Sequence, residues 1–207
     1  MIKLENTTKI LNKKMILDHI NFEFENEKIY GLYGINGSGK TMLLRAIAGL
    51  LILNEGSIEI DHQVLNKDID FPQSIGLIIE NMEMLGNYDA YTNLEILAKI
   101  KKLVTQKEIE NTLKRVRLDE FGKLKVRKFS LGMKQRLNIA QAIMEEPKYL
   151  LLDEPFNALD DSGREMLYQI LKEEKQKGAT IIIAHHYKDE LLKLCDEVIE
   201  IKDGKIQ

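Results

Sequence analysis

The sequence predicts an α/β protein with a core of parallel strands and helices, an N-terminal antiparallel β subdomain and a helical insert. Three observations predict this class. Apolar and polar residues alternate near the N-terminus, which is typical of an antiparallel sheet. Further along, strand-like runs are followed by helix-like segments, as in parallel βα units. A long stretch of helical pattern interrupts that order and is therefore expected to be an insert.

The N-terminal part is expected to consist mainly of short strands. Residues 2–30 have the pattern of short strands, because apolar Ile20, Phe22 and Phe24 are separated by polar neighbours. A strand, a helix and two further strands are then expected, in that order, over residues 28–33, 41–49, 56–61 and 74–79.

Residues 92–146 carry a helical pattern, with Leu94 and Leu97 on one face and Ile109 and Leu113 on another. Strands and helices alternate again beyond it. The expected elements are a strand at 149–152, a helix at 163–177, a strand at 180–184, a helix at 189–194 and a closing hairpin over 198–205. We therefore expect a single domain, 1–207, whose α/β core is formed by 1–81 and 146–207 and whose helical subdomain is 82–145.

Composition and charge argue against several function classes. The net charge of -3 provides no basic footprint for nucleic acid, so no nucleic-acid partner is expected. No run approaches the roughly 18 apolar residues that a bilayer span needs. The N-terminus lacks the pattern of a cleaved targeting segment, so we expect the chain to act from outside the bilayer. The one cysteine, Cys195, is expected in the core of a protein from a reducing compartment.

The segment 99–134 is locally basic, with twelve Lys and Arg against four Asp and Glu. Two interpretations stay open at this point. The segment can be a solvated basic face, or it can be a surface that faces an anionic inner leaflet.

Residues 34–41, G-I-N-G-S-G-K-T, fit the phosphate-loop pattern G-x-x-x-x-G-K-[ST] at every fixed position. The glycines let backbone N–H groups curl around phosphates, and the helix that starts at Lys40 points its positive end at them. Lys40 supplies a charge to the β- and γ-phosphates, and the Thr41 hydroxyl ligates Mg²⁺. A predicted strand precedes the loop and a predicted helix follows it, so we expect a P-loop NTPase core of the RecA-like type. Alone, the loop indicates an NTPase or a kinase. The expected nucleotide-binding residues are Gly34, Ile35, Asn36, Gly37, Ser38, Gly39, Lys40 and Thr41.

Four apolar residues, 149–152, lead into two adjacent carboxylates, Asp153 and Glu154. A buried strand can deliver Asp153 to the Mg²⁺ shell while Glu154 points to the in-line water, where a carboxylate can act as the general base. Without a phosphate loop, the pattern would be only a strand that meets a loop. Together with the phosphate loop, it indicates that a nucleotide is hydrolysed and not merely bound.

Between these motifs lies a segment that resembles a known family. Residues 129–136, F-S-L-G-M-K-Q-R, resemble the signature L-S-G-G-Q-Q-Q-R of ATP-binding cassette (ABC) ATPases. They stand where that family has its signature, after a helical insert and shortly before the acidic strand. Residues 157–160, N-A-L-D, resemble the family's D-loop, and His186 falls where the family carries its switch histidine. The order of these motifs covers essentially the whole chain.

The resemblance implies roles for residues outside the phosphate loop. Two ABC cassettes close head to tail around two ATP molecules, so Ser130 and the backbone around Gly132 are expected to contact the nucleotide of a second cassette from a helix N-terminus. Asp160 of the D-loop is counted with the nucleotide-binding residues. His186 is expected to contact the γ-phosphate and to position the catalytic water. His185 is expected to face the other way and to have no role.

Three positions depart from the family's pattern. The family has Gln after the strand equivalent to 75–79, whereas this chain has Glu80, whose carboxylate can still ligate Mg²⁺. The aromatic residue that stacks on adenine is replaced by Leu11, which is expected to loosen affinity by ~1 kcal/mol. Met42 stands in place of a Thr or Ser and keeps its backbone N–H for the α-phosphate.

Glu80 and the signature segment most resemble the exporter branch related to bacitracin resistance and lantibiotic self-immunity. The implied function is the ATP-hydrolysing subunit of an exporter for an antimicrobial peptide, an antibiotic or another drug. The implied partners are a separate transmembrane permease and a second, identical cassette, at the cytoplasmic face of the membrane. A soluble ABC ATPase that acts on DNA or ribosomes is an alternative, but it would need long coiled coils or two joined cassettes. A small-molecule phosphotransferase is another, but it would have no use for the signature.

Overall fold

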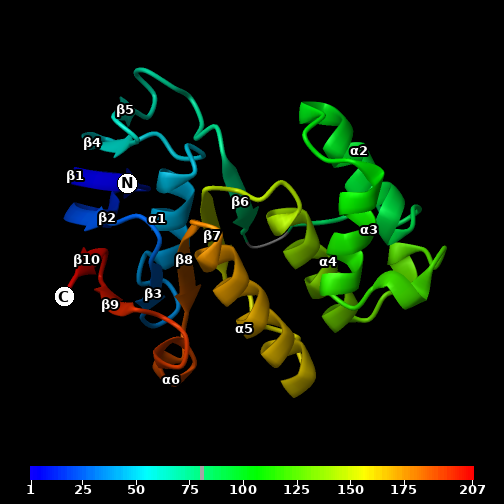
Figure 1. Cartoon of the computed structure of the whole chain (residues 1–207). Helices are drawn as coiled ribbons and strands as arrows, with labels where there is room; N and C mark the ends of the chain where they lie inside the picture. The colour runs from blue at the N-terminus through cyan, green and yellow to red at the C-terminus, as the bar shows by residue number, and fades with distance from the viewer. Residues whose placement is uncertain (80–81) are drawn as a thin grey trace.

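A mostly parallel sheet forms the centre of the computed structural model, which describes residues 1–79 and 82–207 (Figure 1). Its strand order is β10-β9-β3-β8-β7-β6. The strands are β3 (Ile29–Tyr33), β6 (Ile75–Ile78), β7 (Tyr149–Asp153), β8 (Thr180–His185), β9 (Glu197–Lys202) and β10 (Lys205–Ile206). Neighbours from β9 to β6 run parallel, and β10 pairs antiparallel with β9. The predicted α/β core and its closing hairpin are therefore confirmed.

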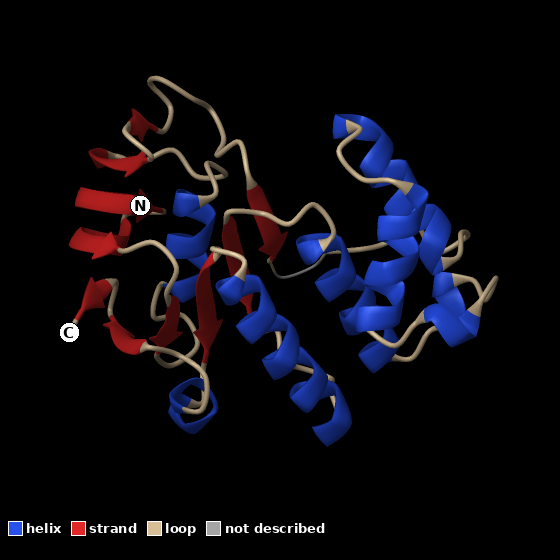
Figure 2. Cartoon of the chain, viewed as in Figure 1, coloured by secondary structure: helices blue, strands red, loops and turns tan. Residues whose placement is uncertain are grey.

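An antiparallel sheet of order β2-β1-β4-β5 is formed by the N-terminal part of the chain. Its strands are β1 (Ile2–Leu11), β2 (Lys14–Phe24), β4 (Glu55–Ile60) and β5 (Gln63–Val64). Figure 2 places this sheet at one end of the molecule, next to the helix α1 (Lys40–Ile47). The predicted N-terminal subdomain is confirmed, although the sequence pattern does not indicate the short strand β5.

The helical pattern over 92–146 resolves into three helices, α2 (Ala90–Lys101), α3 (Gln106–Arg115) and α4 (Leu131–Ile143). Caps explain where they start: the Asp89 carboxylate accepts from the backbone N–H of Thr92, and Thr105 opens α3 with a capping box. Lys102, at a φ of 58°, ends α2. Two 3₁₀ turns, Asp119–Phe121 and Val126–Lys128, separate α3 from α4. The other predicted helices are α5 (Asp161–Gln176) and α6 (Lys188–Leu192).

Two buried apolar clusters fill the two faces of the parallel sheet. Because side chains alternate along a strand, Leu151 packs with α1 and the antiparallel sheet, whereas Leu150 and Leu152 pack with α4 and α5. Each fully buried Leu contributes about 1.5–3 kcal/mol relative to an exposed one. Packing on both faces fixes the strands, and therefore the loops at their carboxyl ends.

The helical lobe contacts both the parallel sheet and the helix α5. Strand β6 lies so close to α4 that a Cβ on Gly76 would overlap the carbonyl oxygen of Ala142. On α3, the Arg115 guanidinium donates at 2.7 Å to the carboxylate of Glu174, which is 1% exposed on α5. The α4 helix is thus shared between the lobe and the sheet, and the boundaries of the subdomain at 82 and 145 stay a prediction.

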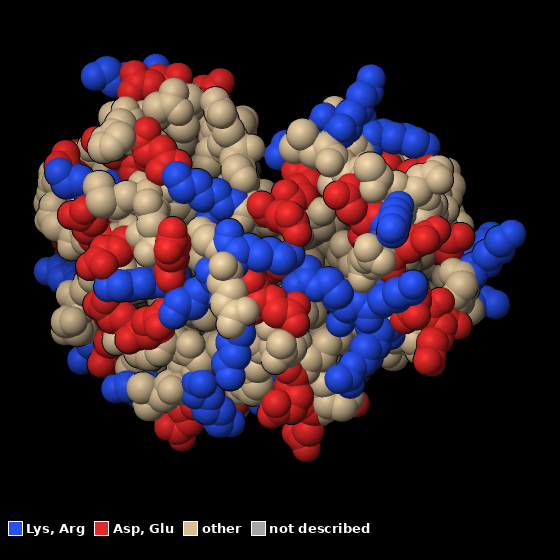
Figure 3. Space-filling view, in the orientation of Figure 1, with Lys and Arg blue, Asp and Glu red and all other residues tan. Residues whose placement is uncertain are grey.

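The distribution of charge on the surface bears on the two interpretations of the basic segment 99–134. On the face drawn in Figure 3, Lys and Arg side chains are interspersed with Asp and Glu across the molecule. That mixture favours the solvated-face interpretation of residues 99–134 for this face. Within the described residues, no helix has the length and apolar character required to cross a bilayer.

Candidate functional site

A cavity of about 620 Å³ opens at the carboxyl ends of β3 and β7, a size suited to a small ligand. These strands flank β8, and their ends are in register, because Tyr33 pairs with His185 and Asp153 pairs with Ala184. Open parallel sheets bind their ligands at the carboxyl ends of the strands. The cavity is lined by Leu11, Lys14, Ile16, Asn36, Gly37, Gly39, Lys40, Thr41, Met42, Arg45, Asp153, Glu154, Asn157 and His186.

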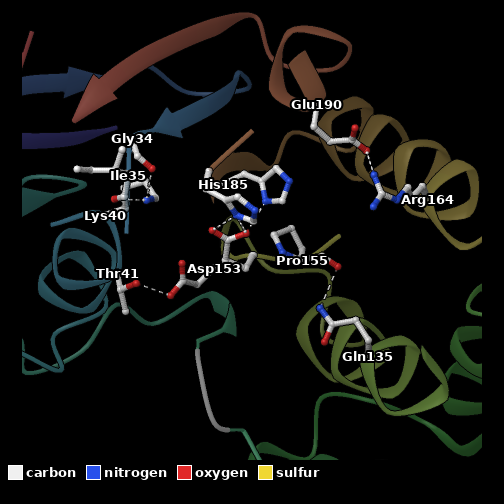
Figure 4. Close-up of polar contacts among 12 residues, drawn as sticks. Gly34, Ile35, Lys40, Thr41, Gln135, Asp153, Pro155, Arg164, His185 and Glu190 are labelled. Atoms are coloured by element: carbon white, nitrogen blue, oxygen red, sulfur yellow. Dashed lines mark hydrogen bonds and ion pairs between the residues drawn. The ribbon is translucent and has the colours of Figure 1, made fainter. Parts of the chain in front are cut away.

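The phosphate loop lies between the end of β3 and the start of α1. Gly37 and Gly39 have φ values of 80° and 114°, a region that favours glycine. The ammonium of Lys40 is buried and donates to the backbone carbonyls of Gly34 at 2.6 Å and Ile35 at 3.1 Å (Figure 4). Burial lowers the pKa of Lys40, although the nearby Glu154 and Asp153 carboxylates act in the opposite direction.

The backbone of the loop leaves room for a phosphate group. The hydroxyl of Ser38 is buried and has no hydrogen-bond partner among the described residues, but Ser38 is not among the residues that line the cavity. Around Gly37, a Cβ would meet nothing within 4 Å, so the backbone there is open to a ligand. A curled backbone with N–H groups, an ammonium and a helix N-terminus is the arrangement that binds phosphate.

A hydrogen bond joins the loop to the acidic strand. The Thr41 hydroxyl donates to Oδ2 of Asp153 at 2.7 Å, and Asp153 is 4% exposed at the end of β7 (Figure 4). A hydroxyl and a carboxylate are oxygen ligands of the kind that Mg²⁺ takes beside a nucleotide. The donor set therefore fits this metal. The third predicted ligand, Glu80, lies outside the described residues, so its placement stays a prediction.

Glu154 follows at a turn in the left-handed region, with a φ of 49°. Its carboxylate contacts both histidines: Nδ1 of His185 lies 2.5 Å from Oε2, and Nδ1 of His186 lies 2.8 Å from the same oxygen. Burial alone would raise the pKa of Glu154, but hydrogen bonds from His185 and His186 outweigh it and leave this pKa lowered. The carboxylate is therefore ionised at neutral pH, as a base must be.

The expectation that His185 faces away from the site is wrong. Side chains alternate within a strand, but β8 ends at His185 and the chain bends at His186, so both rings come to the same carboxylate. The three groups place potential metal-ligating atoms within 4.8 Å of one another. Here the ring nitrogens contact the carboxylate directly.

The predicted contact residues of the signature and the D-loop, Ser130, Gly132 and Asp160, do not line this cavity, although Asn157 at the start of the D-loop does. The hydroxyl of Ser130 caps α4 by accepting from the backbone N–H of Met133, and a Cβ on Gly132 would lie 2.9 Å from the carbonyl oxygen of Ala158. Asp160 caps α5 by accepting from Gly163 N at 2.8 Å. These groups therefore form a second polar surface beside the cavity.

Three cavity residues received no role from the sequence: Lys14, Ile16 and Arg45. Leu11, Lys14 and Ile16 come together because β1 and β2 form a hairpin. Arg45 follows Thr41 by four residues and therefore lies one helical turn along the same face of α1. That spacing is the one signal in the sequence that could have identified Arg45.

Comparisons with known proteins agree with this geometry. The family model described as ABC transporter matches residues 17–157. The chain is 55% identical over 207 residues to the ABC transporter ATP-binding protein YybJ of Bacillus subtilis (strain 168), covering 100% of this chain and 95% of the relative. It is 36% identical over 207 residues to the lantibiotic transport ATP-binding protein SrtF of Streptococcus pyogenes, covering 100% and 89%.

Two solved structures share the fold over the full length of the chain. The dimeric structure of MJ0796, a bacterial ABC transporter cassette, superposes with a TM-score of 0.89 at 26% identity, covering 100% of this chain and 97% of the other. A post-hydrolysis dimer of MJ0796 bound to ADP and Pi also gives a TM-score of 0.89, at 25% identity and the same coverage.

Proposed function

This chain belongs to the family of ABC transporter ATP-binding proteins and is an ATPase, and we propose that it powers a separate membrane permease through ATP-driven pairing with a second copy of itself. The observation that carries the proposal is the shared cavity that brings Lys40, Thr41, Asp153 and Glu154 together at one sheet edge. A phosphate-binding loop, a metal-ligand pair and a base in one cavity are the parts that nucleotide hydrolysis needs.

ATP binding is assigned to the phosphate loop and to the part of the cavity that Leu11 lines, where adenine would lie. Lys40 and the loop N–H groups hold the β- and γ-phosphates, and Leu11 offers an apolar contact to adenine. Thr41 and Asp153 would hold Mg²⁺, which when bound would neutralise negative charge on the phosphates. Their mutual hydrogen bond at 2.7 Å already places both oxygens on one side of the cavity.

Hydrolysis is assigned to Glu154 and His186. Glu154 accepts a proton from water as the water oxygen bonds to the γ-phosphorus and the bond from that phosphorus to the β,γ-bridging oxygen breaks, leaving ADP and phosphate. His186 lines the cavity and is 31% exposed, so its ring can reach the γ-phosphate. The lowered pKa of Glu154 keeps the base ionised before the step.

The second polar surface is assigned to a neighbouring copy. Ser130, the backbone at Gly132 and Asp160 lie outside the cavity, so they serve a nucleotide held by another cassette. The dimeric structures of MJ0796 support this arrangement, since the chain matches them over its full length. Closure around ATP then provides the mechanical step, and hydrolysis resets it.

An exporter of antimicrobial peptides or other drugs is the transport role that the relatives favour. SrtF is a lantibiotic transport ATP-binding protein, and its similarity extends along all of this chain. We place the protein at the cytoplasmic face of the membrane, bound peripherally to its permease. Isolating the protein from native membranes and identifying the co-purifying integral protein tests this role, and recovery without any such partner would count against it.

The pairing is tested with Glu154→Gln. Without the base, hydrolysis should fall to a small residual rate while closure survives, so Mg-ATP should convert this variant from monomer to dimer on size-exclusion chromatography. Lys40→Ala in the same background is the control and should stay monomeric. A Glu154→Gln protein that remains monomeric at saturating Mg-ATP would contradict the proposal.

A further inference from the structure

His185 differs from His186 in burial although both contact one carboxylate. The His185 side chain is 2% exposed, whereas that of His186 is 31% exposed. The ring of His185 packs against Phe156 at 5.5 Å and against Tyr187 at 5.6 Å between centroids. His185 is thus enclosed by side chains, whereas His186, whose ring packs on Tyr187 at 4.0 Å between centroids, borders the cavity.

The hydrogen-bond pattern of His185 indicates which ring nitrogen carries the proton. Nδ1 lies 2.5 Å from Oε2 of Glu154, whereas Nε2 is buried without a hydrogen-bond partner among the described residues. A buried N–H without an acceptor is rarer than an under-used acceptor. The network therefore assigns the proton to Nδ1, which donates to Glu154 and makes His185 a fixed donor.

Glu154 needs such an anchor because its position is otherwise strained. Its φ of 49° is in the left-handed region, which a non-glycine residue adopts at a cost that its surroundings must offset. The backbone N–H of Glu154 donates to Ala184 O at 2.9 Å, and His185 is the next residue of β8. Two successive residues of one strand thus hold both the backbone and the side chain of the base.

We propose that His185 is a positioning residue that keeps the Glu154 carboxylate aimed into the cavity while His186 leaves that carboxylate for the γ-phosphate. The inference rests on the proposed function, because it assigns a task within that hydrolytic site. Two rings of unequal exposure contact one carboxylate, and this permits the division: the buried ring retains the base, and the exposed ring follows the substrate.

Two substitutions separate positioning from packing. His185→Phe keeps an aromatic ring against Phe156 and Tyr187 but has no donor. His185→Asn loses the ring but places an amide N–H₂ close to the position of Nδ1. If His185 positions the base, Phe should lower kcat by about 10- to 100-fold with KM for ATP unchanged, a loss in the range of a misplaced catalytic group. Asn should restore most of that loss, even if its thermal midpoint is lower.

A purely structural role predicts the reverse order, with Phe active and Asn impaired in proportion to its lost stability. That result would overturn the proposal. Imidazole ¹⁵N chemical shifts give a second readout: His185 should show a protonated Nδ1 and an unprotonated Nε2, and the opposite tautomer would also overturn it. His62→Asn, which alters an exposed histidine outside the cavity, is the matched control and should leave kcat unchanged.

A double-mutant cycle tests whether His185 acts through Glu154. In a Glu154→Gln background, adding His185→Phe should lower the residual rate by less than about 2-fold, because the base is already lost. A full 10-fold further loss would show an independent effect and refute the mechanism. Failure of the proposed function would look different, because the unmodified protein would then neither bind nor hydrolyse ATP.

Discussion

The cavity and the second polar surface, which comprises Ser130, Gly132 and Asp160 and is called the signature surface below, differ in how completely each is assembled within one chain. At the cavity, side chains from α1, β7 and the end of β8 converge and contact one another, as the Thr41–Asp153 and Glu154–His186 hydrogen bonds show. At the signature surface, Ser130 and Asp160 instead cap the helices that they precede. One region therefore consists of side chains that already contact one another around a cavity, whereas the other consists of two capped helix N-termini, for which we propose a ligand held by a second cassette.

The largest effect is expected at the cavity. Lys40→Ala removes a buried ammonium that would contact two phosphates, and charge-assisted hydrogen bonds contribute about 1.5–3 kcal/mol each. Affinity for ATP should therefore fall by about 100-fold or more, measured by nucleotide titration of the monomer. Lys13→Ala, at an exposed position outside the cavity, is the control. Unchanged affinity in Lys40→Ala would remove the central assignment of the cavity.

A smaller effect is expected where the helical lobe meets α5. Arg115→Ala leaves Glu174 buried with Lys177 as its remaining cationic partner at 3.2 Å. Because Arg115 is 25% exposed, we discount the penalty for a fully buried pair and expect a loss of about 2 kcal/mol in the free energy of unfolding, measured by urea titration. Monomer affinity for ATP should stay unchanged. A loss of affinity would show that this contact also shapes the cavity.

Ser130→Ala tests the signature surface itself. Removing the hydroxyl should lower turnover by about 10-fold and leave monomer ATP affinity nearly intact, since one hydrogen bond to a charged group is worth about 1.5–3 kcal/mol. The same change removes a helix cap, at a cost of about 1 kcal/mol. Ser130→Gly separates the two effects, because glycine at a cap costs only a few tenths of a kcal/mol. If Ser130→Gly turned over ATP normally, the hydroxyl would have no part in hydrolysis.

The smallest effect is expected at Asp61, remote from both regions. Burial alone would raise the pKa of Asp61, but hydrogen bonds from Lys148, Tyr149 and the N-terminal amine lower it from 3.8 to about 2. A folded pKa below the unfolded one stabilises the protein above pH 3.8, and this stabilisation is lost as pH falls towards 2. The side chain is 40% exposed, so we expect less than about 1 kcal/mol. In Asp61→Asn, this part of the acid dependence of unfolding should disappear.

The sequence predicts local features better than convergent ones. The phosphate loop and the acidic pair are contiguous motifs beside a strand, so the amino-acid pattern alone is enough to assign their residues. Leu11, Lys14 and Ile16 reach the cavity through hairpin pairing, and no spacing along the chain indicates that they share it with Arg45.

The histidine pair shows a second limit. Alternation along a strand predicts opposite faces for neighbours, but this rule ends where β8 ends, at His185. Similarly, the helical periodicity of 92–146 does not indicate the 3₁₀ turns, because their apolar residues Phe121 and Val126 still pack towards the lobe. In both cases the periodic pattern stops being a guide where the strand or helix ends, and the position of that end depends on caps and turns.

The close approach of Gly76 to Ala142 has a mechanical consequence. A helix separated from a strand by full side chains can slide or tilt independently, whereas backbone in contact with backbone leaves no such freedom. A force on the amino end of α4 is therefore expected to move β6 together with the helix. If the amino end of α4 contacts a nucleotide as proposed, a displacement there would be passed on to β6, the outermost strand of the parallel sheet.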